Sequence, residues 1–166
     1  CVVIADLDAT KARDAAAELG TADVAVGIAV DVSSATAVQA ALDATLLAFG
    51  GVDLVVNNAG LSISKPLLDT SEAEWELQHD VMAKGSFLVA QAVARAMIAQ
   101  RLGGDIVYIV SKNAVFAGPN NVGYSATKAD QAHQVRLLAA ELGEHGIRGG
   151  GASAIARARR EQECID

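Results

Sequence analysis

Aromatic side chains are scarce in this chain of 166 residues: they make up 4% of it, whereas hydrophobic residues together make up 52%. A core in such a chain has to be built mainly from aliphatic side chains and alanine. The length suffices for one globular domain with a hydrophobic core and is too small for two.

Positive charge is also scarce, because 13 Lys and Arg face 20 Asp and Glu, which gives a formal net charge of −7. This balance disfavours a surface for nucleic acid or for an anionic membrane, since either would need clustered basic residues. No uninterrupted apolar run approaches the roughly 20 residues that span a bilayer, so we expect no membrane segment.

Cysteine occurs only at Cys1 and Cys164, near the two ends of the chain. The two residues show neither a C-x-x-C pattern nor the spacing of metal ligands. We therefore expect no disulfide framework and no metal site, and a reducing cytoplasm fits best.

Apolar strands alternate with helical segments along the chain. Caps at Asp8 or Thr10, at Ser33 or Ser34 and at Ser71 begin helices, and glycines follow their ends. Strands are predicted at 1–5, 24–30, 52–56 and 105–110, another begins at 147–148, and helices are predicted at about 10–19, 35–49, 72–100 and 124–144. The alternation predicts an α/β fold, a Rossmann-like doubly wound parallel sheet with helices on both faces.

Both ends of the chain depart from this pattern. The chain opens inside a strand, and after Arg148 the patterning gives way to Gly149–Gly151 and an Arg-rich run at Arg157–Arg160. We interpret residues 1–148 as the informative part of a domain truncated at both ends. Residues 149–166 are interpreted as an atypical tail, which a reading-frame shift near Arg148 would explain.

The strongest chemical signal is Tyr124 followed by Lys128 four residues later, which places both on one face of a helix. A phenol ionises near pH 10 and is a poor acid or base at neutral pH, but an ammonium beside it favours the phenolate. Such a pair can take the proton of an alcohol as hydride leaves its carbon. On its own the spacing is common on solvated helix faces.

Ser111 strengthens this interpretation, because it lies thirteen residues before Tyr124, at the carboxyl end of a buried strand. Ligands bind at that end of the strands in open α/β sheets. Its hydroxyl could hold a substrate oxygen beside the phenol, or it could simply cap the strand end.

Further polar or small residues follow other strands, and they predict a dinucleotide site. Asp6 would accept hydrogen bonds from ribose hydroxyls and repel a 2′-phosphate. Asp31 and Val32 would lie where an adenine ring packs, and Asn57 to Gly60, including Ala59, would let the backbone approach a ligand. Helix capping by Asp6 and a plain Asn-Gly turn at 58–60 are the alternatives.

These motifs together resemble those of the short-chain dehydrogenase/reductase family, in order and spacing, over nearly all of residues 1–148. The resemblance implies an NAD-dependent oxidoreductase domain. In it Tyr124 is the general acid/base, Lys128 favours its ionised form and holds the nicotinamide ribose, and Ser111 orients the substrate oxygen. It also implies a homo-oligomer that pairs through the two long helices.

A narrower resemblance concerns Leu61–Pro66, Gln78–Phe87, Ser111–Asn113, Gly118–Asn121 and Ala129–His133. These segments are similar to the carboxyl-terminal dehydrogenase domain of bifunctional rhamnulose-1-phosphate aldolase/lactaldehyde dehydrogenases. This implies oxidation of lactaldehyde in rhamnose catabolism, and an aldolase domain amino-terminal to this one in the parent polypeptide.

The sequence departs from the family at two further places. Met82 stands where the family has a catalytic Asn, so a water relay there would need backbone groups or a neighbour such as Lys84. The first strand and the Gly-rich phosphate loop would precede Cys1. Two alternatives therefore stay open, a non-catalytic nucleotide-binding module and an inactive fragment, as does a dehydrogenase for a sugar alcohol or an oxoacyl substrate.

Overall fold

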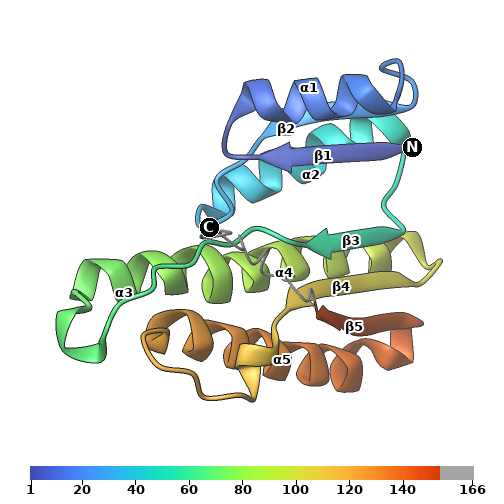
Figure 1. The fold of residues 1–166 in the computed structure, drawn as a ribbon. Coiled ribbons are helices and arrows are strands. Elements are labelled where there is room, and N and C mark those ends of the chain that lie inside the picture. Colours follow the sequence, from blue (N-terminus) through green and yellow to red (C-terminus); the bar gives the residue numbers. More distant parts are fainter. Residues whose placement is uncertain (154–166) are drawn as a thin grey trace, which may run out of the picture.

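The computed structural model describes residues 1–153, in which strands and helices alternate along the chain (Figure 1). The order is β1 (Val2–Asp6), α1 (Ala9–Leu19), β2 (Ala25–Ala29), α2 (Ala35–Phe49), β3 (Leu54–Asn57), α3 (Glu72–Gln78), α4 (Gly85–Gln100), β4 (Gly104–Val110), α5 (Val122–Leu142) and β5 (Ile147–Ser153). The predicted α/β fold of the Rossmann type is confirmed.

Polar caps begin the helices as the sequence predicted. Asp8 accepts hydrogen bonds from the backbone N–H groups of Thr10 and Lys11 at the start of α1, and Ser34 accepts one at the start of α2. Ser71 and Glu74 form a reciprocal capping box at the start of α3. Gly50 ends α2 with a φ of 79°, a left-handed conformation that favours glycine.

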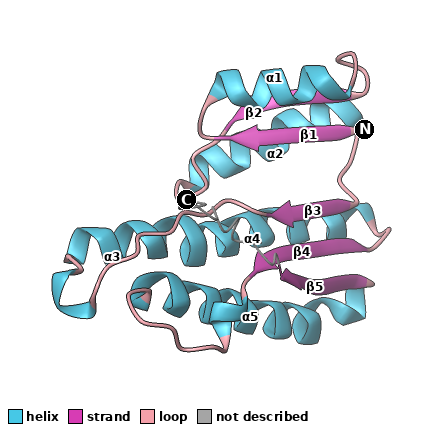
Figure 2. Ribbon diagram, in the orientation of Figure 1, coloured by secondary structure: helices cyan, strands magenta, loops and turns pink. Residues whose placement is uncertain are grey.

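The strands form two parallel sheets. β1 pairs with β2, whereas β4 lies between β3 and β5, and no ladder joins the two sheets within the described residues. Figure 2 shows β1 facing β3, with both strands pointing the same way. The first strand of the fold is expected in this position, between the strands that end at Asp6 and Asn57.

Helices cover both faces of the β1–β2 sheet. α1 packs against β2 through Gly27, where a Cβ would lie 2.4 Å from the backbone of Ala12. α2 lies on the other face, and it shares one core with α4, α5 and the second sheet, built around Leu42, Met97 and Tyr108. Leu54 and Val56 of β3 remain 56% and 49% exposed, because no described helix covers that face of the second sheet.

One predicted helix differs from expectation. The segment expected to be a single helix over 72–100 contains a π-helical turn, His79–Lys84, between α3 and α4. By length and composition Glu72–Gln100 could cross a bilayer, contrary to our reading of the apolar runs. However, α4 contributes Ala90, Val93 and Met97 to the core, as the central helix of a globular domain does.

The strand that starts at Ile147 extends further than expected, because it runs through the three glycines to Ser153. Each of its residues pairs with β4, from Gly104–Ile147 to Val110–Ser153. Arg148 donates two hydrogen bonds of 2.7 Å to the carboxylate of Asp105 on β4. Residues 149–153 are therefore part of the sheet, while the interpretation of 154–166, including Cys164, lies outside the described residues.

Candidate active site

The carboxyl ends of the strands bring the predicted site residues to one edge of the molecule. Asp6 and Asn57 are the last residues of β1 and β3, while Asp31 and Ser111 follow β2 and β4 closely. Because the strands are parallel, these ends share an edge, which is where open α/β sheets bind ligands.

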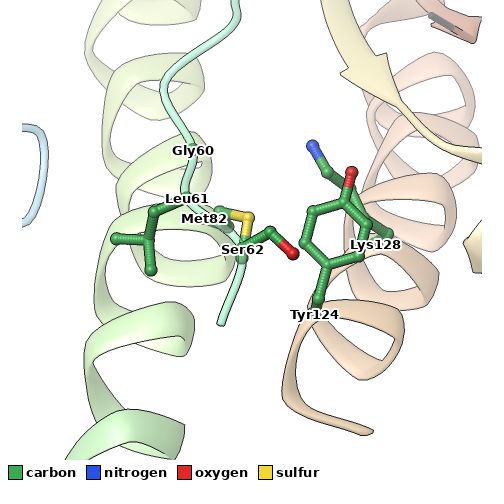
Figure 3. A pocket seen from close by; sticks show the side chains of 6 residues that line it. All are labelled: Gly60, Leu61, Ser62, Met82, Tyr124 and Lys128. Atoms are coloured by element: carbon green, nitrogen blue, oxygen red, sulfur yellow. The ribbon is translucent and has the colours of Figure 1, made fainter. Parts of the chain in front are cut away.

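A pocket of about 220 Å³ opens at this edge, between the segment after β3 and the first turns of α5. Its lining consists of Gly60, Leu61, Ser62, Met82, Tyr124 and Lys128. Figure 3 shows Tyr124 and Lys128 side by side on one helix, with Met82 and Ser62 across from them. Tyr124 and Lys128, which were predicted to share one face of a helix, thus line one pocket in the structure.

The ammonium of Lys128 is buried, and only 5% of the residue is exposed. Its Nζ donates to the carbonyl of Ile109 at 2.7 Å and to Oε1 of Gln131 at 2.9 Å. Burial lowers the pKa of Lys128, because desolvation penalises the charged form. Among the described residues no carboxylate forms an ion pair with it, so its charge is available to the pocket.

Tyr124 lies at the start of α5, with the Nζ of Lys128 5.7 Å from the centre of its ring. Its backbone carbonyl accepts a hydrogen bond of 2.8 Å from the hydroxyl of Thr127, which holds the first turn of the helix. A phenol beside a buried ammonium, open to a pocket, can exchange a proton with a bound alcohol or carbonyl.

The other tyrosine is placed differently. Tyr108 on β4 is fully buried, and its hydroxyl donates to the backbone carbonyl of Ser86 at 3.0 Å. Burial and the nearby charge of Asp130 raise its pKa, so it stays a neutral phenol. Tyr108 is therefore a structural residue, which leaves Tyr124 as the candidate acid/base.

Ser111 lies directly after β4 but is not part of the lining of the pocket. Its hydroxyl accepts a hydrogen bond of 3.2 Å from the N–H of Asn113 and so caps the short turn that follows. The hydroxyl proton can still be donated to a substrate oxygen. The substrate-orienting role of Ser111 stays a prediction.

The residues expected to bind the cofactor are spread along the same edge. Asp6 is exposed and accepts a hydrogen bond of 2.8 Å from the N–H of Asp8. The carboxylate of Asp31 is bound by the hydroxyl and the N–H of Ser33, which lowers its pKa. Val32 packs against Gly85, where a Cβ would come within 2.8 Å of its side chain.

At the end of β3 the chain passes from a buried, hydrogen-bonded residue to exposed small residues. The side chain of Asn57 is buried and donates to the backbone carbonyl of Ser86 at 3.3 Å. Ala59 and Gly60 are exposed, and a Cβ at Gly60 would lie 3.3 Å from the sulfur of Met82. Asn57 thus ties the strand end to α4, and Gly60 lets the backbone pass close to Met82.

Sequence reasoning missed several residues of the site. Leu61 and Ser62 line the pocket, and Gln131 holds Lys128, although no role in the site was predicted for any of them. Ser62 follows the small residues after β3 and could have been suspected from that position. Gln131 gives no such signal, because a glutamine within a helix is most often a surface residue.

A family model of short chain dehydrogenases matches residues 1–153. The chain therefore belongs to the short-chain dehydrogenase/reductase family, a family of oxidoreductase enzymes. The family prediction is thereby confirmed, and it supports the prediction of an enzyme of this type.

Individual relatives agree with this assignment. The chain is 43% identical over 150 residues to the uncharacterized oxidoreductase YuxG of Bacillus subtilis (strain 168), matching 89% of this chain and 22% of that protein. It is 37% identical over 148 residues to D-threitol dehydrogenase of Mycolicibacterium smegmatis (strain ATCC 700084 / mc(2)155), matching 89% of this chain and 56% of that protein. The chain thus spans little more than half the length of these relatives, or less.

Among solved structures, the chain matches a gluconate 5-dehydrogenase from Burkholderia cenocepacia J2315 in complex with NADP and tartrate. The TM-score is 0.81 at 33% identity, and the match covers 90% of this chain and 59% of that one. These matches do not show the narrower resemblance to the aldolase-linked subgroup.

The described residues fit one part of a dinucleotide site. The exposed carboxylate of Asp6 suits ribose hydroxyls, and the pocket beside Gly60 and Lys128 suits a nicotinamide ribose. None of the described connections from a strand to the next helix is a Gly-rich phosphate loop. Residues 1–153 thus contain groups that suit two ends of such a site, and no Gly-rich phosphate loop lies among these described residues.

Proposed function

We propose that this chain is the catalytic part of an NAD-dependent oxidoreductase that oxidises a small alcohol or hydroxy-aldehyde. The observation that carries this proposal is the pocket in which Tyr124 and the buried ammonium of Lys128 lie together. Their proximity gives the phenol a cationic neighbour, with Nζ of Lys128 5.7 Å from the centre of the ring.

In this proposal a nicotinamide dinucleotide held beside Lys128 and Gly60 would supply the hydride acceptor for the substrate carbon. Tyr124 receives the proton of the substrate hydroxyl, and Lys128 stabilises the negative charge on the phenol oxygen while it binds the nicotinamide ribose. Ser111 donates a hydrogen bond to the substrate oxygen. For this it must lie within hydrogen-bonding reach of a substrate held in the pocket.

NAD is preferred over NADP in the proposal because of Asp6. Its carboxylate is exposed at the end of β1, where it would accept hydrogen bonds from the adenosine ribose and repel a 2′-phosphate. The solved relative that binds NADP is a gluconate 5-dehydrogenase, so cofactor choice has to be measured for this chain.

Two substrate classes are proposed. The resemblance of several loop segments to the aldolase-linked subgroup favours lactaldehyde. The segment of YuxG that matches this chain is only 22% of that protein, which supports a dehydrogenase domain within a longer polypeptide, where an aldolase domain could precede it. The similarity to D-threitol dehydrogenase favours a sugar alcohol instead.

The remaining predictions follow from the same picture. We propose a cytoplasmic protein that acts on a small molecule, binds neither nucleic acid nor membrane, and pairs with copies of itself. The strand and phosphate loop that would complete the site are proposed to belong to residues that precede Cys1 in the parent polypeptide.

The deciding experiment measures NADH formation by the full-length polypeptide with lactaldehyde and with a panel of sugar alcohols, beside its Tyr124→Phe variant. We expect turnover that this variant reduces by about a thousandfold, because the hydroxyl that exchanges the proton is removed while Lys128 stays in place. The dissociation constant for NAD should change little.

The outcomes separate the alternatives. Turnover with a sugar alcohol but not with lactaldehyde would retain the reaction class and discard the rhamnose assignment. Tight NAD binding without any turnover would favour a non-catalytic nucleotide-binding module. Undiminished turnover in Tyr124→Phe would contradict the proposed mechanism.

A further inference from the structure

The ammonium of Lys128 has three N–H donors, and protein acceptors take two of them. The carbonyl of Ile109 approaches from β4, and Oε1 of Gln131 approaches from the next turn of α5. Two fixed acceptors orient the third N–H, which is the one left for the pocket. Gln131 therefore helps to set the direction in which Lys128 acts.

The side chain of Gln131 is fully buried, and all its strong hydrogen-bonding groups are engaged. While Oε1 accepts from Lys128, Nε2 donates to the backbone carbonyl of Met82 at 3.0 Å and contacts Oγ of Ser86 at 2.6 Å. Lys128 can only donate and the Met82 carbonyl can only accept, so the amide has a single consistent orientation.

The acceptors for this amide come from an irregular segment. Met82 lies in the π-helical turn His79–Lys84, where Gly85 donates its N–H to the carbonyl of Asp80, five residues back. Two neighbouring carbonyls of this turn accept from side chains of α5, that of Met82 from Gln131 and that of Ala83 from Gln134 at 3.0 Å. The turn and α5 are thus joined by two parallel amide bridges.

Only one of the two bridges reaches the site. Gln134 contacts Asp130 and the hydroxyl of Tyr108, and it makes no hydrogen bond to Lys128. The thioether of Met82 lines the pocket and takes only a weak contact of 3.8 Å from the hydroxyl of Thr127. It offers no strong hydrogen bond to an ammonium, so the described polar link from the π-helical turn to Lys128 is Gln131.

We propose that Gln131 is a positioning residue for Lys128, which it anchors to the π-helical turn in the orientation that turnover and binding of the nicotinamide ribose require. This inference rests on the proposed function for its kinetic part. The contact between Gln131 and Lys128 is observed in the structure and does not depend on the proposed function.

The test compares Gln131→Met with Gln134→Met in the full-length polypeptide. Each change keeps the length of the side chain and removes one amide bridge to the π-helical turn, so both should lower Tm by similar amounts. Only Gln131→Met should lower kcat, by about tenfold or more, which corresponds to about 1.4 kcal/mol of lost transition-state stabilisation. Only this variant should also weaken NAD binding, by several-fold.

A double-mutant cycle with Lys128→Ala distinguishes positioning from general destabilisation. If Gln131 acts through Lys128, Gln131→Met changes the NAD dissociation constant by less than twofold once Lys128 is absent. Equal kinetic effects of the two glutamine variants, or additive effects of Gln131→Met and Lys128→Ala, would overturn the proposal.

A second variant covers the case in which Gln131→Met fails to fold. Gln131→Asn keeps a neutral amide but shortens the side chain by one methylene, which withdraws the acceptor from Lys128. Its kcat should fall more than that of Gln134→Asn, and equal kinetic effects of these two variants would also overturn the proposal. If the wild type turns over none of the substrates, the proposed function fails. The double-mutant cycle, measured by NAD binding, still tests whether Gln131 positions Lys128.

Discussion

The ammonium of Lys128 is buried without a carboxylate partner among the described residues, and neutral acceptors alone offset its desolvation. An ion pair at this position would neutralise the charge that the phenol of Tyr124 needs. Carbonyl dipoles support the ammonium without cancelling its charge. The pKa of Lys128 is lowered because its ammonium is buried and no ion pair with a described residue compensates for the lost hydration.

At the same scale, Glu74 predicts a dependence of stability on pH. An ion pair with Lys65 and hydrogen bonds from Ser71 lower its pKa from 4.5 to about 2. Its ionised form is stabilised in the folded state, so this contribution is complete above about pH 4.5 and is lost as the pH falls through about 2.

The measurement is urea unfolding of the wild type and of Glu74→Gln between pH 6 and pH 2. We expect the wild type to be more stable at pH 6 and the difference to vanish towards pH 2. A difference that stays constant over this range would show that Glu74 does not carry the effect. The matched control is Glu72→Gln, in the same first turn of α3 and without an ion pair to a described residue.

Individual site residues were predictable where their spacing along the chain indicates their role. Tyr124 and Lys128 were found because positions four residues apart share a helix face. Gln131 was missed because its acceptors, Met82 and Ser86, lie more than forty residues earlier in the chain. Such a partnership is created by packing and leaves no local pattern.

At the scale of elements, the three glycines of β5 give a paired prediction. A Cβ at Gly149 would lie 2.9 Å from the backbone carbonyl of Val135 on α5, whereas a Cβ at Gly150 would meet nothing within 4 Å. Gly149→Ala should therefore destabilise the fold by about 1–3 kcal/mol through overpacking. Gly150→Ala should leave stability unchanged or raise it by up to about 1 kcal/mol, because the unfolded chain loses freedom.

Chemical denaturation of the two variants in the full-length polypeptide checks this prediction, and each serves as the control for the other. Equal effects of the two substitutions would mean that β5 does not pack against α5 in the observed register. The bidentate pair of Arg148 and Asp105 fixes that register from the neighbouring strand.

The order of elements was predictable, and two of their irregularities were not. Caps and hydrophobic periodicity located the starts of α1, α2 and α3 to within a residue or two. The π-helical turn His79–Lys84 escaped because its apolar pattern continues that of the helices on either side. Gly149–Gly151 were not recognised as a strand because glycine has low strand propensity. Close packing against α5 favours the lack of a side chain at Gly149 alone.

At the scale of the whole molecule, the facing edges of β1 and β3 have no ladder partner within the described residues. Unpaired backbone groups at the centre of a sheet are costly, and Leu54 and Val56 expose apolar surface beside them. We expect residues 1–166 alone to unfold with low cooperativity and to bind NAD at least about a hundredfold more weakly than the full-length polypeptide, since the phosphate loop contributes directly to affinity.

Calorimetry, NAD titration and hydrogen exchange on both proteins test this expectation. Amides of β1 and β3 should gain protection in the full-length polypeptide, whereas those of β4, which is paired on both sides, should be protected in both. A sharp cooperative melt and micromolar NAD binding by residues 1–166 would contradict it.

Ser86 touches three parts of the molecule at once. Its backbone carbonyl accepts from Asn57 on β3 and from Tyr108 on β4, and its hydroxyl meets Gln131, which holds Lys128. The open edge of the sheet is therefore connected through a single helical residue to the ammonium in the pocket. We therefore expect assembly of the sheet beside β3 and the orientation of Lys128 to be linked through Ser86, so that a chain lacking the central strand would also hold its lysine less firmly.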